Sequence, residues 1–517
     1  MANATSLGRK ATIGAGWMIA WRAVSRLLGM ANTIILARLL VPADFGIVAM
    51  AMAFETSLLM MTTFPVQDAL LRRPETDTNL HDAAFTIQIT RAILSALVIA
   101  AAAPAAARWF AEPRLIPLIL ALAGTTVVNG LSNIGTVQFA RELRFDVQVK
   151  VQALPAVLQI IATLGVAWLT RSYWALIVGL AVSRLGRVVM TYMVHPYRPR
   201  LSLRGWRQLV GFSFWLWLTS LAAMVLAQVD TFVVGPVFGA AGLGLYTLAG
   251  QVATLPTSEL VDPVAGIMFA GFSYAQREQQ TTAANPMSIA SALLLLLSPM
   301  ALMVSAGAGS LVALLLGAKW LAAAPLVMIA ACQCLFRPFI DVPRAAFIAR
   351  GHVRSQFVIT AIAALMRVIL LAAATMTGSL MAVAAATVAA SAGNMLLYTR
   401  NPLSEVKDRG GRFFTGIARI VLATLIAALP LVMLHLGWQP PETGRLWRLT
   451  AFVHLGLIGA TVSAIYFVAL FGLWLVFGRP NGPERVILNL LQEFAVGRWL
   501  TGLAARVTLC LSWQSAK

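Results

Sequence analysis

The chain has 517 residues, of which 59% are hydrophobic and only 11% are charged, and its mean hydropathy is +0.81. This composition excludes a soluble domain of such size. The formal net charge of +20 does not indicate a nucleic-acid partner, because the basic residues are spread over short loops between apolar segments, where they report membrane topology. We therefore expect an all-α integral membrane protein.

Fourteen apolar segments are long enough to cross a bilayer as helices. In chain order they are 13–36, 46–68, 83–107, 115–138, 151–169, 173–194, 209–234, 243–270, 286–308, 323–348, 355–375, 379–399, 415–436 and 449–477. Lys and Arg concentrate in alternate loops, such as those that hold Arg141 and Arg198. The positive-inside rule then places both chain ends in the cytoplasm.

A short internal repeat indicates two related halves. The connection at 39–46 (LLVPADFG) and the connection at 237–244 (VFGAAGLG) are 198 residues apart, and both fall on the outer side of the predicted topology. Two parallel six-helix lobes around a central cavity are a transporter design. The predicted domains are an N-terminal lobe at 1–196, a basic cytoplasmic linker at 197–208, a C-terminal lobe at 209–400, two additional transmembrane helices at 401–478, and a cytoplasmic amphipathic tail at 479–517.

Nine arginines fall inside the predicted spans: Arg22, Arg26, Arg91, Arg184, Arg187, Arg337, Arg344, Arg367 and Arg419. An arginine at the bilayer centre costs about 2.5–3.5 kcal/mol on insertion scales, so this set must face protein, water or an anion. Arg184 and Arg187 lie toward the cytoplasmic end of the sixth predicted span, which suggests side chains that reach the head groups. Arg337 and Arg344 lie within one helical turn of Asp341, which predicts structural ion pairs.

Polar residues recur at helical spacing beside several of these arginines, which predicts faces turned toward a wet cavity. Stripes without charge also suit hydrogen bonds between helices. The predicted substrate-binding residues are Arg22, Arg26, Asn32, Gln88, Arg91, Gln251, Arg337 and Arg367. Glu55 and Asp230 are predicted either to couple transport to an ion or to balance the charge of a cavity arginine.

No catalytic or metal-binding constellation is visible in the sequence. Cys332 and Cys334 lie in an apolar run without histidine partners, and three cysteines in all do not make a disulfide framework. The longest loops have about fifteen residues and carry no acidic pair. These features favour movement of a substrate over chemistry, and no metal or cofactor is expected.

The chain resembles the Wzx-type polysaccharide flippases of the superfamily of multidrug, oligosaccharidyl-lipid and polysaccharide exporters. The matching stretches are 36–46 (LARLLVPADFG), 67–73 (QDALLRR), 141–146 (RELRFD), 173–176 (YWAL), 198–201 (RPRL), 230–235 (DTFVVG) and 243–249 (LGLYTLA). Together these stretches are spread over about residues 10–400. The first and last stretches are more specific to the family than the others. Past residue 400 the resemblance fades, so the last two helices and the tail rest on hydropathy.

The resemblance implies a transporter, not an enzyme, that moves oligosaccharide repeat units on undecaprenyl diphosphate from the cytoplasmic to the periplasmic leaflet of a bacterial inner membrane. It implies alternating access, a role in exopolysaccharide or lipopolysaccharide synthesis, and contact with membrane lipids. A polysaccharide polymerase and a chain-length regulator are the protein partners to expect. A lipid II flippase, a cation-coupled multidrug exporter and a membrane glycosyltransferase are the alternatives. The deep arginines disfavour the drug exporter, and the short loops disfavour the transferase.

Overall fold

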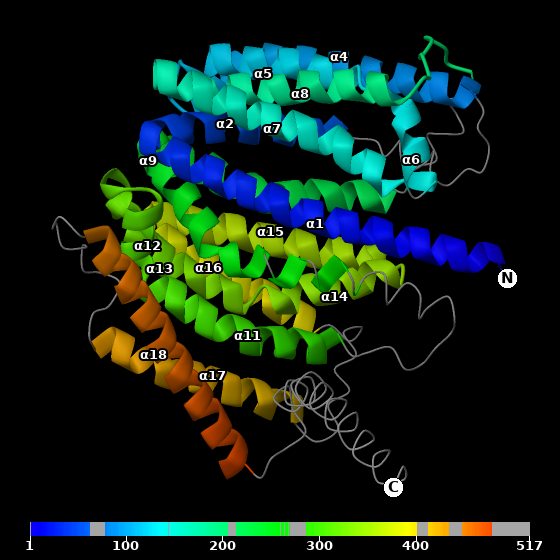
Figure 1. Ribbon diagram of the computed structural model, residues 1–517. Helices are drawn as coiled ribbons and strands as arrows, with labels where there is room; N and C mark the ends of the chain where they lie inside the picture. The colour runs from blue at the N-terminus through cyan, green and yellow to red at the C-terminus, as the bar shows by residue number, and fades with distance from the viewer. Residues whose placement is uncertain are drawn as a thin grey trace, which may run out of the picture. The chain divides into compact units, whose positions relative to one another are not determined.

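The computed structural model describes most of the chain. Its described residues are 2–62, 78–142, 144–204, 214–258, 260–262, 264–266, 268, 286–400, 412–433 and 447–477. Every regular element within them is helical (Figure 1). Ten of these helices are long and apolar enough to cross a membrane, and two shorter apolar helices occur at Leu115–Gly130 and Thr415–Leu431. The count of fourteen spans stays a prediction, and the predicted tail at 479–517 lies outside the described residues.

The α-helices are α1 (Ala2–Leu39), α2 (Pro42–Thr62), α4 (Thr78–Trp109), α5 (Leu115–Gly130), α6 (Val137–Arg141), α7 (Phe145–Thr170), α8 (Trp174–Val194), α9 (Phe214–Ala253), α11 (Pro286–Ala306), α12 (Ala308–Leu315), α13 (Ala324–Ala330), α14 (Pro338–Ala349), α15 (Val353–Thr375), α16 (Leu380–Thr399), α17 (Arg412–Met433) and α18 (Trp447–Val476). Three short 3-10 helices join them: η1 (Ile134–Thr136), η3 (Ala318–Ala323) and η4 (Ala331–Leu335).

The helices form two compact units. The first unit comprises Met1–Ala249, Val312–Leu326 and Thr360–Ala386, and the second unit comprises Gly250–Leu311, Val327–Ile359 and Thr387–Lys517. In the first unit, α7 packs along α8 and along α1, while α5 packs against α2, α4 and α8. In the second unit, α11 packs against α14, α17 and α18. The lobe boundaries expected near residues 196 and 209 stay a prediction.

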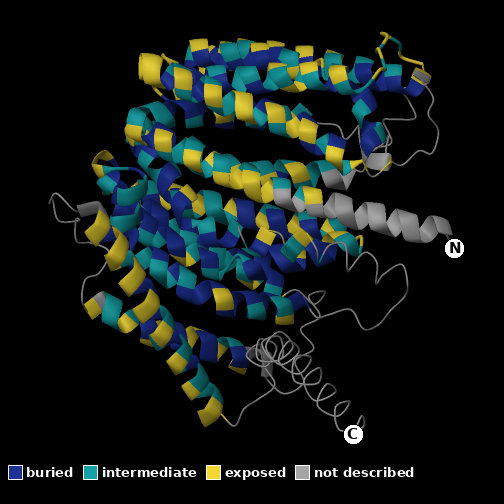
Figure 2. Cartoon of the chain, viewed as in Figure 1, coloured by how far each residue is buried: buried dark blue, intermediate teal, exposed yellow. Residues whose placement is uncertain are grey.

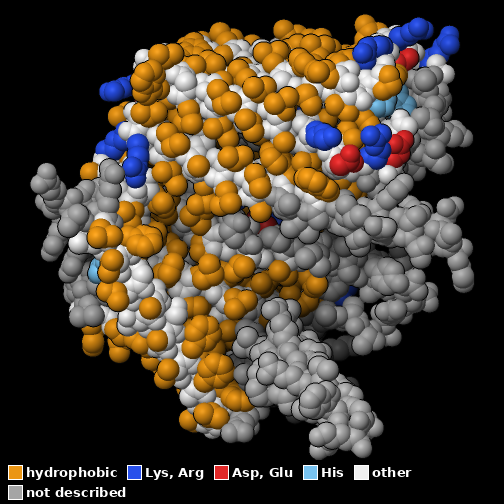
Figure 3. Space-filling model, viewed as in Figure 1, with side chains coloured by type: hydrophobic (Ala, Val, Ile, Leu, Met, Phe, Trp, Pro, Cys, Tyr) orange, Lys and Arg blue, Asp and Glu red, His pale blue; other side chains and the backbone are white. Residues whose placement is uncertain are grey.

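The outer face of the first unit is apolar. On α7, Leu154, Ile161 and Trp168 are exposed, and on α8, Val189 and Met193 are exposed (Figure 2). Charged side chains gather toward the two ends of this unit, with hydrophobic side chains between them (Figure 3). Large exposed apolar side chains in a continuous band need a nonpolar solvent. Together with the ten spans, this band identifies a multi-pass membrane protein.

Helix α9 folds back on itself at Gly239. This residue has φ 67° and ψ −176°, a conformation that strains any residue with a β-carbon. The Tyr246 hydroxyl donates to Asp230 Oδ2 at 2.6 Å, although sixteen residues of straight helix would separate the two by about 24 Å. The chain therefore reverses at Gly239, where the sequence predicts the junction of segments 7 and 8.

The two repeated connections contact each other reciprocally. A β-carbon added at Gly46 would overlap the carbonyl oxygen of Ala240, and one added at Gly244 would overlap the carbonyl oxygen of Pro42. The repeat offset of 198 residues relates Pro42 to Ala240 and Gly46 to Gly244. Gly46 therefore packs on Ala240, and its equivalent Gly244 packs on Pro42, the equivalent of Ala240. A two-fold relation between the halves requires such an exchange. This reciprocity supports the predicted internal repeat.

Basic and aromatic side chains cap the C-terminal ends of α1 and α12 in the first unit. Arg38 donates to the carbonyls of Leu314 and Leu315 near the end of α12. In return, Lys319 Nζ donates to the Arg38 carbonyl at 2.9 Å, and Trp320 Nε1 donates to the Ala37 carbonyl at 2.7 Å. The last carbonyls of a helix lack intrahelical donors. Cations at this end also interact favourably with the negative end of the helix dipole. These contacts give Arg38, in the LARLLVPADFG stretch, a structural role.

Candidate functional site

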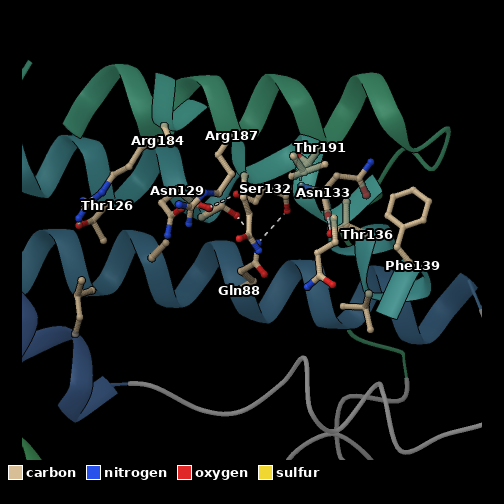
Figure 4. A pocket seen from close by; sticks show the side chains of 18 of the residues that line it. Gln88, Thr126, Asn129, Ser132, Asn133, Thr136, Phe139, Arg184, Arg187 and Thr191 are labelled. Atoms are coloured by element: carbon tan, nitrogen blue, oxygen red, sulfur yellow. Dashed lines mark hydrogen bonds between the residues drawn. The ribbon is translucent and has the colours of Figure 1, made fainter. Parts of the chain in front are cut away.

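A polar cavity of about 840 Å³ lies within the first unit (Figure 4). Its volume is within the range of about 300–1,000 Å³ typical of ligand sites. Helices α1, α2, α4, α5, α7 and α8 contribute to its wall, together with η1 and α6. Among the polar residues that line it are Ser25, Gln88, Arg91, Ser95, Thr126, Asn129, Ser132, Asn133, Thr136, Gln148, Gln152, Arg184, Arg187 and Thr191. A wet cavity thus opens inside an otherwise apolar bundle.

Two helices present matching polar stripes to this cavity. On α4, Gln88 and Arg91 are three residues apart and Ser95 follows four residues later. On α8, Arg184, Arg187 and Thr191 repeat the same spacing. Because residues at i, i+3 and i+7 share a helix face, each helix turns one basic stripe inward. Figure 4 shows the side chains of Arg184 and Arg187 pointing from α8 toward α5.

Gln88 fixes the end of α5 beside the cavity. Its Nε2 donates to the carbonyl oxygens of Gly130 at 2.9 Å and Ser132 at 3.0 Å. Gly130 is the last residue of α5 and Ser132 lies two residues beyond it, where intrahelical donors run out. The predicted binding residue Gln88 lines the cavity, but its amide donors are already used by the backbone. We therefore assign it to positioning of the Asn129 and Ser132 region.

A buried ion pair forms part of the cavity wall. Arg184 Nη1 lies 2.6 Å from Glu55 Oε1 and donates to the Thr125 hydroxyl at 2.7 Å. The Thr126 hydroxyl also donates to Glu55 Oε1 at 2.8 Å. Glu55 is 1% exposed, so its charge depends on these partners. The expectation that Arg184 reaches the head groups is corrected here, because a carboxylate 129 residues away in the sequence holds it at the cavity.

The cavity wall is positively charged. Arg91, Arg184 and Arg187 line it, and none of the lining residues in the described chain is an Asp or a Glu. Glu55, behind Arg184, supplies one compensating charge. Within the described residues, no carboxylate lies at ion-pair distance from Arg187. Guanidinium groups around a wet space favour an anionic ligand.

The predicted residues on α1 lie differently from the expected stripe. Arg22 and Arg26 are exposed, and the residues of α1 that line the cavity are Trp21 and Ser25. Asn32 is half-buried, and its Oδ1 has no hydrogen-bond partner among the described residues. Helix α1 packs along α7, which sets its rotation about its own axis. The placement of Arg22 and Arg26 therefore does not bring them to this cavity.

Arg367 is held by Asp230. Arg367 Nε lies 2.8 Å from Asp230 Oδ1, and its Nη2 lies 2.7 Å from Asp230 Oδ2. Tyr246 completes the group through its hydroxyl. Bidentate pairing with a carboxylate satisfies the planar fork of the guanidinium. Asp230 thus balances the charge of Arg367 in this structure, and the two roles predicted for it, ion coupling and charge balance, stay predictions.

The remaining predicted residues lie in the second unit. Arg337 pairs with Asp341 at 2.8 Å and with Asp262 at 3.4 Å, and Arg344 pairs with Asp341 at 3.0 Å. The ion pairs expected around Asp341 are therefore present. Gln251 is exposed near the end of α9. None of these residues lines the cavity of the first unit.

Replacing Asp230 with Asn should strongly destabilise the protein. The change leaves the charge of Arg367 without its carboxylate in a mostly buried site, and breaking such a pair costs about 3–5 kcal/mol. Thermal unfolding in detergent measures the loss. Glu112→Gln, which breaks a pair with Arg114, whose side chain is 53% exposed, is the control and should cost about 1 kcal/mol or less. Equal unfolding temperatures for the two variants would contradict the assignment.

A non-helical segment after α8 is hydrogen-bonded to α4 and to Asn133 beside the cavity. The Tyr197 hydroxyl donates to Asp82, the Arg200 backbone N–H donates to Asp82 Oδ1 at 2.9 Å, and Asn133 Nδ2 donates to the Tyr197 carbonyl at 2.8 Å. Burial and the neighbouring Asp82 raise the pKa of Tyr197, which keeps the hydroxyl a neutral donor. The first residues of the predicted linker are thus tied to α4 and to the region that follows α5.

A family model described as polysaccharide biosynthesis protein matches residues 35–325, which is more than half of the chain. The chain belongs to this family. The succinoglycan biosynthesis transport protein ExoT of Rhizobium meliloti (strain 1021) is 24% identical over 61% of this chain and 64% of its own length. The teichuronic acid biosynthesis protein TuaB of Bacillus subtilis (strain 168) is 21% identical over 61% and 66%. The chain thus spans slightly less than two thirds of these relatives.

Two solved structures show the fold class. The lipid II flippase MurJ in an inward closed conformation matches with a TM-score of 0.66 and 14% identity, over 88% of this chain and 99% of that one. An inward-facing multidrug resistance transporter of the MATE family matches with a TM-score of 0.55 and 15% identity, over 77% and 95%. The chain therefore shares the helical fold of these two transporters.

Among the polar residues that line the cavity, only Gln88 and Arg91 belong to the predicted binding residues. Thr126, Asn129, Arg184 and Arg187 all line it, yet none is among the predicted binding residues. One signal was available, because Arg184, Arg187 and Thr191 repeat the spacing of Gln88, Arg91 and Ser95. Two arginine-containing faces of equal spacing in one six-helix lobe favour a shared cavity over two separate contacts with head groups.

Proposed function

We propose that this protein moves oligosaccharide repeat units, attached to a polyprenyl diphosphate, from the cytoplasmic to the periplasmic leaflet of a bacterial inner membrane. The observation that carries the proposal is the positively charged, polar cavity within a membrane-spanning helical unit. Membership of a polysaccharide biosynthesis family and the transport protein among the relatives support it. The N- and C-termini are cytoplasmic in this proposal.

The head group of such a substrate matches the chemistry of the cavity. A diphosphate carries fixed negative charge and accepts bidentate hydrogen bonds, which Arg91 and Arg187 supply without losing their own charge. Sugar hydroxyls both donate and accept, as do the Asn129 amide and the Ser132 hydroxyl. The aromatic ring of Trp21 also borders the space.

The membrane potential supplies a driving force in this proposal. Moving one elementary charge through 100 mV changes the free energy by about 2.3 kcal/mol, so two negative charges gain about 4–5 kcal/mol on leaving an inside-negative cell. Alternating access exposes the cavity first to one leaflet and then to the other. The polyprenyl tail stays in the hydrocarbon layer throughout. Translocation that ignores an imposed potential would contradict this part of the proposal.

Glycan analysis of a deletion strain tests the proposal. We expect complete lipid-linked repeat units to accumulate facing the cytoplasm, because synthesis continues while transfer stops. Truncated units would instead indicate a glycosyltransferase, and accumulated peptidoglycan precursor would indicate a lipid II flippase. Normal export of polymer from the deletion strain would contradict the proposed function.

A further inference from the structure

The arginines of the cavity and its neutral polar groups lie in different parts of it. Figure 4 shows Arg184 toward one end of the cavity and Thr136 toward the other end. Among the described residues that line the cavity from position 129 to position 156, none is charged. An uncharged region with hydrogen-bonding side chains therefore adjoins the arginines. We call it the neutral region, and its polar residues include Ser132, Thr136, Gln148 and Gln152.

Gln148 brings an unfilled hydrogen-bond acceptor to the neutral region. The start of α7 is tied to α6, because the Arg144 N–H donates to the Phe139 carbonyl at 2.9 Å and the Gln148 N–H donates to the Arg144 carbonyl at 3.3 Å. Gln148 Oε1 is enclosed and has no hydrogen-bond partner among the described residues. An acceptor that is kept from water without a partner is unfavourable. Since the terminal torsion of glutamine turns easily, a donor on a ligand in the cavity can bind this oxygen.

The neighbouring hydroxyl groups also present acceptors. The Ser132 hydroxyl donates its hydrogen to the Asn129 carbonyl at 2.8 Å, and the Thr136 hydroxyl donates its hydrogen to the Asn133 carbonyl at 2.9 Å. Each hydroxyl oxygen keeps a lone pair for a further donor. Together with Gln148 Oε1, these oxygens favour a ligand that brings hydrogen-bond donors.

We infer that the neutral region binds the sugar attached to the diphosphate, that this sugar is uncharged, and that Gln148 helps to select it. The inference rests on the proposed function. The first sugar of a lipid-linked oligosaccharide is bonded directly to the diphosphate, so it lies beside the arginines when they hold the phosphates. Its hydroxyl groups supply the donors that the neutral region lacks. The carboxylate of an acidic sugar supplies acceptors alone.

The charges of the cavity wall agree with an uncharged first sugar. Arg91 and Arg187 carry positive charge, whereas the charge of Arg184 is balanced by Glu55. A diphosphate diester carries one negative charge on each phosphate and so matches the first two arginines. The described lining residues then offer no further cation to a sugar carboxylate. Because an ionised group without a partner is costly to remove from water, an acidic first sugar is disfavoured.

Binding of two synthetic conjugates to the purified protein tests the inference. Farnesyl diphosphoglucose and farnesyl diphosphoglucuronic acid differ in one group of the sugar, which is a hydroxymethyl in the former and a carboxylate in the latter. We expect the wild type to bind the glucose conjugate at least about tenfold more tightly in calorimetric titrations. Equal affinities, or tighter binding of the glucuronic acid conjugate, would overturn the inference and leave diphosphate recognition intact.

Variants of Gln148 test whether this side chain takes part in the selection. Gln148→Met keeps the length of the side chain but removes the acceptor, so it should weaken binding of the glucose conjugate by about five- to tenfold. Gln148→Lys supplies a cation and donors, so it should lower the preference for the glucose conjugate by about tenfold or more. Gln159→Met makes the same change on the same helix at a position that does not line the cavity. This matched control should bind both conjugates as the wild type does.

The outcomes separate this inference from the function on which it rests. An unchanged preference in Gln148→Lys, or unchanged binding of the glucose conjugate by Gln148→Met, would overturn the role of Gln148. If neither variant folds, the comparison of the two conjugates on the wild type still decides whether the first sugar is uncharged. A folded wild type that binds neither conjugate would overturn the proposed function and this inference with it.

Discussion

Replacing Arg91 and Arg187 together with Ala should stop polymer export while leaving the amount of protein in the membrane unchanged. The two side chains line the cavity from opposite helices, α4 and α8. A hydrogen bond to a charged group contributes about 1.5–3 kcal/mol, so losing both lowers substrate affinity by about 3–6 kcal/mol, or more than ~100-fold. Polymer released by a complemented deletion strain is the measurement. Each single variant should retain a reduced level of export.

Two further variants separate charge from geometry in this experiment. Arg187→Lys keeps the charge but loses the planar fork, so it should export at an intermediate level. Arg108→Ala removes an exposed arginine at the far end of the same helix as Arg91 and should export normally. Normal export by the Arg91 and Arg187 double variant would remove both residues from the site.

Gly46→Ala should prevent accumulation of stable protein. The added methyl group overlaps the carbonyl oxygen of Ala240, and a backbone carbonyl within a helical turn cannot rotate away. Overpacking typically costs about 1–3 kcal/mol and more where the backbone must move. Gly244→Ala should cost a similar amount, because its methyl group overlaps Pro42 in the equivalent contact. Thermal unfolding in detergent and the protein level in membranes measure both variants.

Gly29→Ala on α1 is the matched control for the glycine variants. A β-carbon there meets nothing within 4 Å, and Ala is favoured over Gly inside a helix by up to about 1 kcal/mol. The control should therefore unfold at the wild-type temperature or slightly above it. An unchanged unfolding temperature for Gly46→Ala would contradict the close reciprocal contact of the two connections.

Hydropathy was sufficient to predict the helical architecture and several turns. The junction of segments 7 and 8 falls at Gly239, where the chain reverses, and the repeat at 39–46 and 237–244 corresponds to a reciprocal contact. These features depend on local sequence, such as apolar length and glycine position. They can therefore be read without knowledge of the neighbouring helices.

The identity of the cavity residues depends on neighbours far away in the sequence. On α1, rotation by one residue decides whether Arg22 or Trp21 faces the cavity, and packing on α7 sets that rotation. Arg184 stays at the cavity because Glu55 of α2 holds it, and Arg367 is neutralised by Asp230 of α9. The spacing of arginines along one helix cannot reveal such partners. The sequence pattern predicted the cavity-lining residues Gln88 and Arg91 but not Arg187.

Translocation by purified protein in lipid vesicles tests the central claim most directly. A fluorescent oligosaccharide on undecaprenyl diphosphate is incorporated, and an added glycosidase removes the label from molecules in the outer leaflet. We predict that the wild-type protein moves the protected pool to the outer leaflet and that the Arg91 and Arg187 double Ala variant does not. Equal transfer by the two proteins, or no transfer by folded wild type, would contradict an arginine-lined path for the diphosphate.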